Sequence, residues 1–134
     1  MSSALPLVVF SHRGSLFGLE AIRVAGRGLV DAQMASIVPF AALYSVDSGT
    51  EASFSEPVTQ WLRLRGHTAD WLLGLSSDAD LIELEPADIY PLPEMMAQSS
   101  IFKPLKALGF YQSQLVALLD VDALERHHRQ TSRI

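Results

Sequence analysis

The sequence contains no cysteine, and this absence removes several kinds of chemistry. Without cysteine there can be no disulfide bond, no thiolate nucleophile and no cysteine-ligated zinc site. Basic residues are also few: ten lysines and arginines stand against fifteen aspartates and glutamates, which gives a formal net charge of -5. Because affinity for nucleic acids rests largely on lysines and arginines that neutralise phosphates, this balance argues against a nucleic-acid partner.

Long apolar runs are missing as well. No stretch approaches the roughly 18 apolar residues that a membrane-spanning helix needs. The first apolar run, residues 5–10, has no basic segment before it and ends at Ser11-His12-Arg13, so we interpret it as a strand and not as part of a signal peptide. We therefore expect no membrane insertion and a cytoplasmic protein. Hydrophobic residues make up 49% of the 134 residues, which predicts one domain over residues 1–134 with a real core.

Short apolar stretches separated by turn residues predict a chain rich in β-strands. Residues 5–10 and 16–19 flank the turn-forming segment Ser11–Ser15 and predict a hairpin. Residues 58–65 (VTQWLRLR) alternate between two faces, which is typical of a half-buried strand. Further runs of this kind are residues 71–75, 81–84 and 115–119, the last interpreted as buried. The spacing indicates an all-β barrel or sandwich.

Two segments predict helix. Residues 20–25 place three apolar side chains on one face, and Gly26 and Gly28 are expected to end this short helix. Near the C-terminus, Asp120 is placed to cap a last helix that runs to about residue 129.

Residues 34–46 (MASIVPFAALYSV) form the longest apolar stretch and contain Pro39. Because proline cannot donate a hydrogen bond to a neighbouring strand, Pro39 favours a strand at a sheet edge. We expect a strand followed by a short helical turn, and then a loop over residues 47–57.

Two histidine-containing segments could suggest chemistry, but each has a plainer explanation. His127-His128 resembles a metal-binding pair, yet adjacent residues of a helix point about 100° apart and rarely bind one ion. We expect a solvated helix end and a polar tail from about residue 127. His67 with Asp70 could be a base and its orienting carboxylate, but no serine stands on a nucleophile elbow, so a polar turn is expected.

The acidic and glycine-containing motifs are equally weak signals. Glu83, Glu85 and Asp88 lack a partner carboxylate across a cleft and predict a solvated strand face. Gly26-Arg27-Gly28 lacks the third glycine of a dinucleotide-binding loop. We therefore expect no catalytic residue, no metal site and no cofactor.

Several motifs, in their order and spacing, resemble the CheW-like domain of bacterial chemotaxis. WLLGLSSDADLIEL followed by EPADIYPLP is similar to that family's "VGLLVDSVSEVLRL" followed by "PPEDIEPLP". The closing LVALLDVDALE is similar to "LVLLLDLEKLL", the opening LVVFSHRGSLFGLEAIRV to "LVVFRLGGERFALPVERVREV", and SIVPFAALYSV to "RVVPVVDLRRLLG". The resemblance covers most of the chain.

The resemblance implies an all-β fold of two small intertwined five-stranded β-barrels with a short C-terminal helix. It also implies that the protein is not an enzyme, because family members are adaptors that couple chemoreceptors to the histidine kinase CheA. The expected partners are a CheA-type histidine kinase, a chemoreceptor or another CheW-like domain. Two alternatives stay open: a CheW-like module of another chemosensory pathway, for type IV pili or gene regulation, and a self-associating regulatory subunit.

The chain also departs from the family pattern. The family's Asn-Leu-Arg-Gly segment is absent before the strand at Ile37, so one barrel is expected to be shortened. Ala42 and Ser76 stand where the family has aspartates. Because loss of an edge segment exposes unpaired backbone groups, we expect self-association through that edge as a homo-oligomer.

The partner contacts are predicted within the long apolar stretch. We nominate Ile37, Phe40, Leu43 and Tyr44, each of which could equally belong to the core. The proline-rich segment EPADIYPLP (residues 85–93) is expected to be extended and to carry the chain from one barrel to the other.

Overall fold

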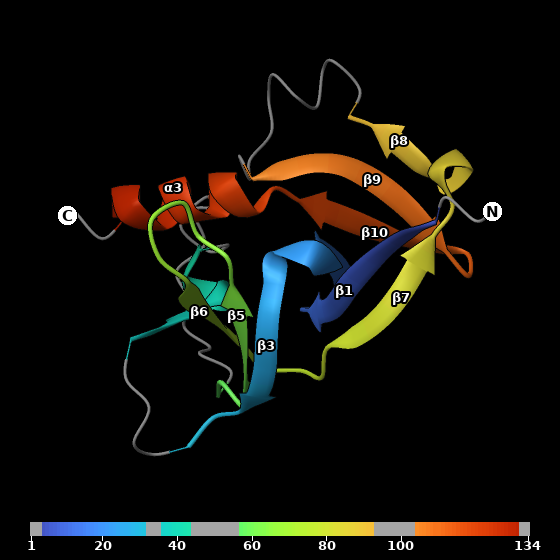
Figure 1. The fold of residues 1–134 in the computed structure, drawn as a ribbon. Coiled ribbons are helices and arrows are strands. Elements are labelled where there is room, and N and C mark those ends of the chain that lie inside the picture. The colour runs from blue at the N-terminus through green and yellow to red at the C-terminus, as the bar shows by residue number, and fades with distance from the viewer. Residues whose placement is uncertain (1–3, 32–35, 44–56, 93–103, 132–134) are drawn as a thin grey trace.

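The computed structural model describes residues 4–31, 36–43, 57–92 and 104–131. Over these residues the chain forms two sheets (Figure 1). The larger has the strand order β7-β1-β2-β10-β9-β8 and the smaller the order β3-β5-β6-β4. The strands are β1 (Leu5–His12), β2 (Ser15–Glu20), β3 (Val24–Leu29), β4 (Ile37–Pro39), β5 (Gln60–Leu64), β6 (Trp71–Leu75), β7 (Asp80–Leu84), β8 (Ile89–Pro91), β9 (Leu105–Tyr111) and β10 (Gln114–Leu119). The helices are the 3-10 turns η1 (Ala21–Arg23) and η2 (Pro86–Asp88) and the α-helix α3 (Val121–Thr131), and residues 40–43 also form a helical turn.

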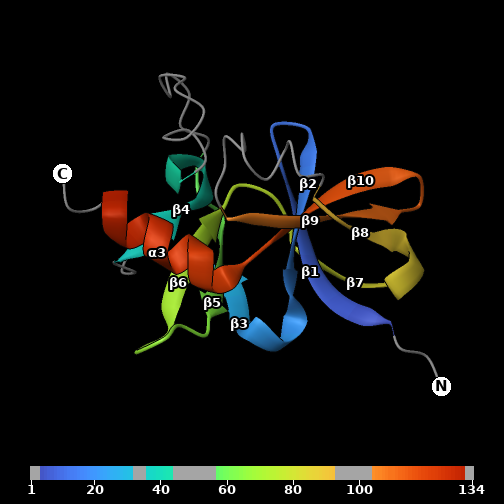
Figure 2. The same cartoon turned by 90° about the horizontal axis from the view of Figure 1, so that it is seen from above.

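The predicted all-β architecture with two small sheets and a short C-terminal helix is confirmed. Over the described residues the strands divide into six and four, where five and five were expected. The short strand β8 pairs with β9 and supplies the sixth strand of the larger sheet. Over the described residues, the smaller sheet is the one with fewer strands. Figure 2 shows α3 lying over this smaller sheet.

Two tight hairpins are set by residues with positive φ. Arg13 and Gly14, at φ 52° and 84°, turn β1 back onto β2, and this confirms the first predicted hairpin. Gln112 and Ser113, at φ 50° and 65°, do the same between β9 and β10. Two consecutive residues with φ > 0 are typical of the hairpin turn that matches the natural twist of strands. β2 and β10 then pair in parallel, which joins the two hairpins into one sheet.

The prediction of one or two helical turns over residues 20–25 is confirmed in part, but Gly26 and Gly28 do not end a helix. Only one 3-10 turn, η1, forms there, and the chain continues directly into β3, with Gly26 and Gly28 inside the strand. The indole ring of Trp61 on β5 covers both glycines, and a Cβ at Gly28 would lie 2.7 Å from Trp61 Cζ2. The glycines therefore make room for an aromatic ring on the neighbouring strand and do not end a helix.

An arginine fixes η1 where the chain crosses from one sheet to the other. The Arg23 guanidinium donates to the Arg65 carbonyl oxygen and to Asp122 Oδ1, both at 2.7 Å. The hydrogen bond from Arg23 lowers the pKa of the Asp122 carboxyl below its ordinary value, and burial opposes this only in part. One side chain thus links the crossing to the residue after β5 and to the first turn of α3.

The core has two parts. The first lies between the sheets, where Phe10, Phe17 and Phe40 pack ring against ring with centroids 4.9 to 5.9 Å apart. Leucines of the smaller sheet and of α3 complete it: Leu62, Leu64, Leu73, Leu75 and Leu124. The second part fills the curl of the larger sheet and consists of Leu7, Val9, Ile82, Leu84, Val116 and Leu118. Burial of such side chains contributes about 1.5 to 3 kcal/mol each.

The curl of the larger sheet brings its end strand β7 against β9. A Cβ at Gly109 on β9 would lie 2.6 Å from Leu84 Cδ1 on β7, so glycine is needed where β7 crosses β9. Residues 85–88 connect β7 to β8, and these are the two end strands of this one sheet. The prediction that this segment carries the chain between barrels is therefore wrong, because Ile89 pairs with Gly109 and keeps the segment in the larger sheet.

The interpretation of residues 34–46 is confirmed where the structure describes them. β4 is an end strand of the smaller sheet, as Pro39 indicated, and the helical turn Phe40–Leu43 follows it. The predicted cap of the last helix is confirmed too. Asp120 Oδ1 accepts hydrogen bonds from the backbone N–H groups of Asp122 and Ala123 at 3.0 and 3.4 Å.

The end of α3 differs from the prediction of a solvated helix end and a polar tail from residue 127. His127 is only 7% exposed, and its Nε2 lies 3.1 Å from the carbonyl oxygen of Leu43. His128 stacks on Trp71 with ring centroids 5.9 Å apart. The prediction is wrong at these positions because the packed face of α3, which includes Leu124, continues one turn further over the smaller sheet.

Candidate protein-interaction site

Three exposed apolar side chains lie on adjacent strands of the larger sheet. Tyr90 on β8, Phe110 on β9 and Leu115 on β10 are 49%, 47% and 51% exposed. The Tyr90 and Phe110 rings meet edge to face with centroids 6.0 Å apart. Leu108 on β9, which is half-buried, is paired with Tyr90. We call these four residues the outer-face patch.

The strand register explains why these side chains share one face. Phe110 pairs with Leu115, and residues directly opposite in an antiparallel ladder point to the same side. Leu108 lies two positions from Phe110 and so points to that side as well. Gly109, between them, faces the sheet interior, where Leu84 and Leu118 approach it. The interior of the sheet is filled without the patch, and the patch is left to solvent.

The border of the outer-face patch is polar. The Lys106 ammonium forms an ion pair with Glu20 at 3.0 Å on the same face of β9 as Phe110. Gln112 and Gln114 lie beside Phe110 and Leu115 at the β9–β10 turn. A contiguous apolar patch with a polar border is typical of a surface that binds another protein, and aromatic side chains dominate the energetics of such contacts.

The residues nominated from the sequence occupy other places. Phe40 and Leu43 are 2% and 1% exposed, so the core alternative describes both of them in this structure. Ile37 is half-buried on β4, and its Cγ2 would lie 2.8 Å from a Cβ at Gly74. Tyr44 lies outside the described residues. The three nominated residues that the structure describes do not form one exposed surface. The role of all four as partner contacts stays a prediction.

The residues of the outer-face patch were not identified from the sequence. Residues 115–119 were interpreted as a buried run, but Leu115 is half exposed because it faces outward beside Phe110. The usable signal was the alternation in β9: Lys106, Leu108 and Phe110 take one face, and a glycine stands on the other. The patch is continuous because β9 pairs with β8 and β10 in a particular register, and this register was not predicted from the sequence.

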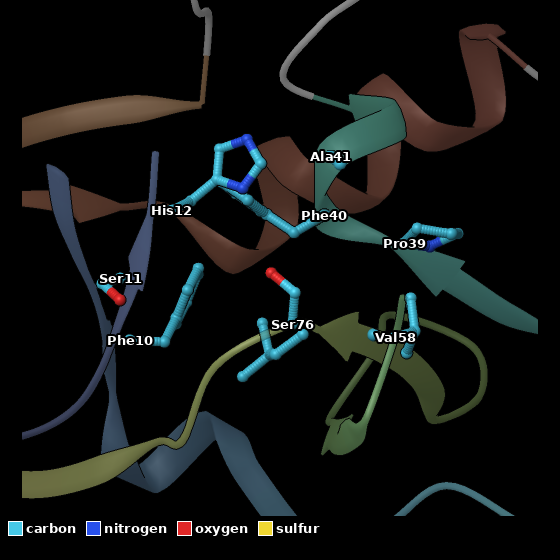
Figure 3. A pocket seen from close by; sticks show the side chains of 10 residues that line it. Phe10, Ser11, His12, Pro39, Phe40, Ala41, Val58 and Ser76 are labelled. Carbon is cyan, nitrogen blue, oxygen red and sulfur yellow. The ribbon is translucent and has the colours of Figure 1, made fainter. Parts of the chain in front are cut away.

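A small pocket lies where β1 meets the Phe40–Leu43 turn (Figure 3). His12 and Ser76, which come from different elements, are among the residues that line it, beside Phe10 and Phe40. Its volume is about 10 Å³, which is room for about one water molecule. The pocket is therefore too small to hold an organic substrate.

The remaining polar candidates lie at the surface. His67 and Asp70 are exposed in the turn before β6, and the backbone N–H of His67 donates to Glu125 Oε1 at 3.1 Å. Glu83, Glu85 and Asp88 are exposed along β7 and η2, as expected for a solvated strand face. Among the described residues no group of three or more histidines and carboxylates is placed to hold a metal ion, and no helix is both long and apolar enough to cross a membrane.

Comparison with known proteins agrees with this architecture. Neither protein-family models nor curated proteins give a match to the sequence. Among solved structures, the fold is similar to that of the scaffolding protein TtCheW from Thermoanaerobacter tengcongensis, with a TM-score of 0.69 and 11% sequence identity. The superposition covers 90% of this chain and 92% of that protein. The chain therefore has the CheW-like fold, as the order of its sequence motifs indicated.

Proposed function

We propose that this protein is a non-enzymatic adaptor in bacterial chemotaxis-type signal transduction. It acts in the cytoplasm and binds a CheA-type histidine kinase or a chemoreceptor. The CheW-like fold supports the proposal, since a solved structure with a similar fold is named a scaffolding protein. The observation that carries it is the outer-face patch, whose Tyr90 and Phe110 rings are half exposed on rigid strands.

The patch suits reversible docking. Its side chains are held by β8, β9 and β10, so little conformational freedom is lost when a partner covers them. Its two aromatic rings are the kind of residue that carries most of the binding energy in protein interfaces.

The test is titration calorimetry of the whole chain against the regulatory domain of a CheA-type kinase encoded in the same genome. We expect a dissociation constant in the micromolar range, about -8 kcal/mol. Phe110→Ser should weaken binding by about tenfold or more, because it removes a central aromatic contact. Ile22→Ser is the matched control: Ile22 is 76% exposed on η1 and does not belong to the patch.

The outcomes separate the patch from the adaptor role. If wild-type protein and Phe110→Ser bind with equal affinity, the kinase does not bind the outer-face patch and must contact another face of the molecule. Absence of heat with wild-type protein would remove the kinase as a partner, and the same titration with a chemoreceptor signalling tip would then decide whether the adaptor proposal survives.

A further inference from the structure

Each sheet ends in a strand with a free edge, and the two edges carry opposite charge. Over the described residues β3 pairs only with β5, and β7 pairs only with β1 (Figure 1). The other end strand of the smaller sheet, β4, contains Pro39, which cannot donate a ladder hydrogen bond. Unpaired strand edges are templates for pairing with another chain unless they are blocked.

The β3 edge presents an arginine and a leucine on one face. Arg27 and Leu29 pair with Leu62 and Gln60 of β5, two positions apart, so both point to the same side. Leu29 is 74% exposed although it is apolar, and Arg27 is exposed as well. Arg27 Nη1 donates to the Ala79 carbonyl oxygen at 2.7 Å. Because a guanidinium carries five N–H donors, this bond positions the group and leaves it able to bind a carboxylate.

The β7 edge presents the complementary pair. Leu81 is 66% exposed and Glu83 is exposed, again two positions apart on one face. The residues that alternate with them, Ile82 and Leu84, are buried in the core of the larger sheet. Each free edge therefore carries one exposed leucine and one charged residue at the same spacing.

We propose that β3 of one copy of this chain pairs antiparallel with β7 of a second copy. The register sets Arg27 opposite Glu83 and Leu29 opposite Leu81, so one alignment forms both an ion pair and an apolar pair on the same face. On the other face it sets Gly26 and Gly28 against Leu84 and Ile82. The Trp61 ring already covers that face of the glycines, and the two apolar side chains point into their own core.

Pairing of two identical edges satisfies these residues less well. An antiparallel β3–β3 contact sets Arg27 against a second arginine or against Leu29. A β7–β7 contact likewise sets Glu83 against a glutamate or against Leu81. Like charges directly opposite destabilise a ladder, and a charge opposite a leucine loses its partner. Only the mixed contact matches both pairs.

The mixed contact joins different surfaces of the two copies, so it does not close on itself by two-fold symmetry. Such a heterologous contact generates rings or open chains of subunits. It goes beyond the proposed adaptor function and uses the strand edges, not the outer-face patch. Because only about four residues pair on each side, the assembly is weak and fades as salt screens the ion pair.

The experiment is sedimentation velocity of the purified full chain over a range from about 10 µM to 1 mM, the range of weak association. Wild-type protein should increase in weight-average mass with concentration. Arg27→Glu and Glu83→Lys should each raise the apparent dissociation constant about tenfold, since each places like charges opposite one another. An equimolar mixture of the two variants should regain association. In the mixture, the glutamate at position 27 of one variant lies opposite the lysine at position 83 of the other, so the two charges attract.

Two further charge reversals serve as controls. Association should be unchanged in Arg63→Glu and Asp88→Lys, because these exposed charges lie off both edges.

The pattern across the variants decides the contact. Association that is lost in both variants and regained in the mixture supports the β3–β7 contact. Monomeric wild-type protein over the whole range overturns it. Loss in Arg27→Glu with unchanged Glu83→Lys points to β3–β3 pairing and overturns it too. Circular dichroism of each variant shows whether it is folded, and the regain in the mixture cannot come from unfolded chains.

Discussion

The two sheets of this protein bury their apolar side chains in different ways. The larger sheet curls until β7 crosses β9, and it fills its interior with its own side chains, with Gly109 giving way to Leu84. The smaller sheet has four strands over the described residues and leaves β3 unpaired on one side. Its buried leucines pack against α3 and against Phe10 of β1 and Phe17 of β2, which belong to the larger sheet. The smaller sheet thus keeps a buried core because other elements pack against its leucines.

The largest test of this comparison is removal of the ring that joins the two sheets. Phe40→Ala should lower the free energy of unfolding by about 3 to 5 kcal/mol, because it deletes a side chain that is 2% exposed and contacts both Phe10 and Phe17. Phe110→Ala, on the outer face of the larger sheet, should cost less than about 1 kcal/mol. Urea unfolding measures both. Similar losses in the two variants would mean that the smaller sheet does not depend on this junction.

Glycine substitutions probe the close packing of the larger sheet. Gly109→Ala should destabilise by about 1 to 3 kcal/mol, because its Cβ would overlap Leu84, which is 2% exposed. Gly26→Ala, on the free edge of the smaller sheet, meets nothing closer than 3.7 Å. It should be neutral or stabilise slightly by reducing the freedom of the unfolded chain. Thermal unfolding with equal shifts for both alanines would contradict the difference in packing.

The cover over the smaller sheet can be loosened at the end of α3. His127→Ala should cost about 1 to 3 kcal/mol, because it leaves the Leu43 carbonyl oxygen without the imidazole donor and removes a buried ring. Arg126→Ala, at the exposed neighbouring position, is the control and should change stability by less than about 0.5 kcal/mol. Denaturant titration that ranks Arg126→Ala as the more costly change would rule out the burial of this histidine.

The smallest effect is expected at the ion pair between η1 and α3. Asp122→Asn should cost about 1 kcal/mol or less, since the Asp122 side chain is 50% exposed and its pair with Arg23 is screened by solvent. The pKa of this carboxyl is lowered in the folded protein, so its contribution is complete above the ordinary aspartate pKa and is lost as pH falls through the lowered value. The difference in stability between wild type and Asp122→Asn should therefore shrink in acid. A difference that grows below about pH 4, near the ordinary aspartate pKa, would have the wrong sign.

Local patterns predicted much of this fold. The alternation in residues 58–65, the turn between β1 and β2, the edge position of Pro39 and the Asp120 cap depend on neighbours in sequence, and each is confirmed. The failures depend on distant contacts. The glycines of β3 were misinterpreted because Trp61 covers them from another strand, and His127 because Leu43 lies 84 positions away. The outer-face patch was missed because its continuity depends on the register in which β9 pairs with β8 and β10.

The parallel pairing of β2 with β10 has a consequence for the order of folding. Leu16, Phe17 and Gly18 align with Val116, Ala117 and Leu118, so about a hundred residues of chain must be in place before this ladder can form. Closing so long a loop costs entropy before any contact offsets it, and folds rich in such distant pairings are slow to form. During synthesis, the larger sheet is therefore completed only when β10, the last strand of the described residues, has been made. The β1–β2 hairpin and the β5–β6 pair can form earlier.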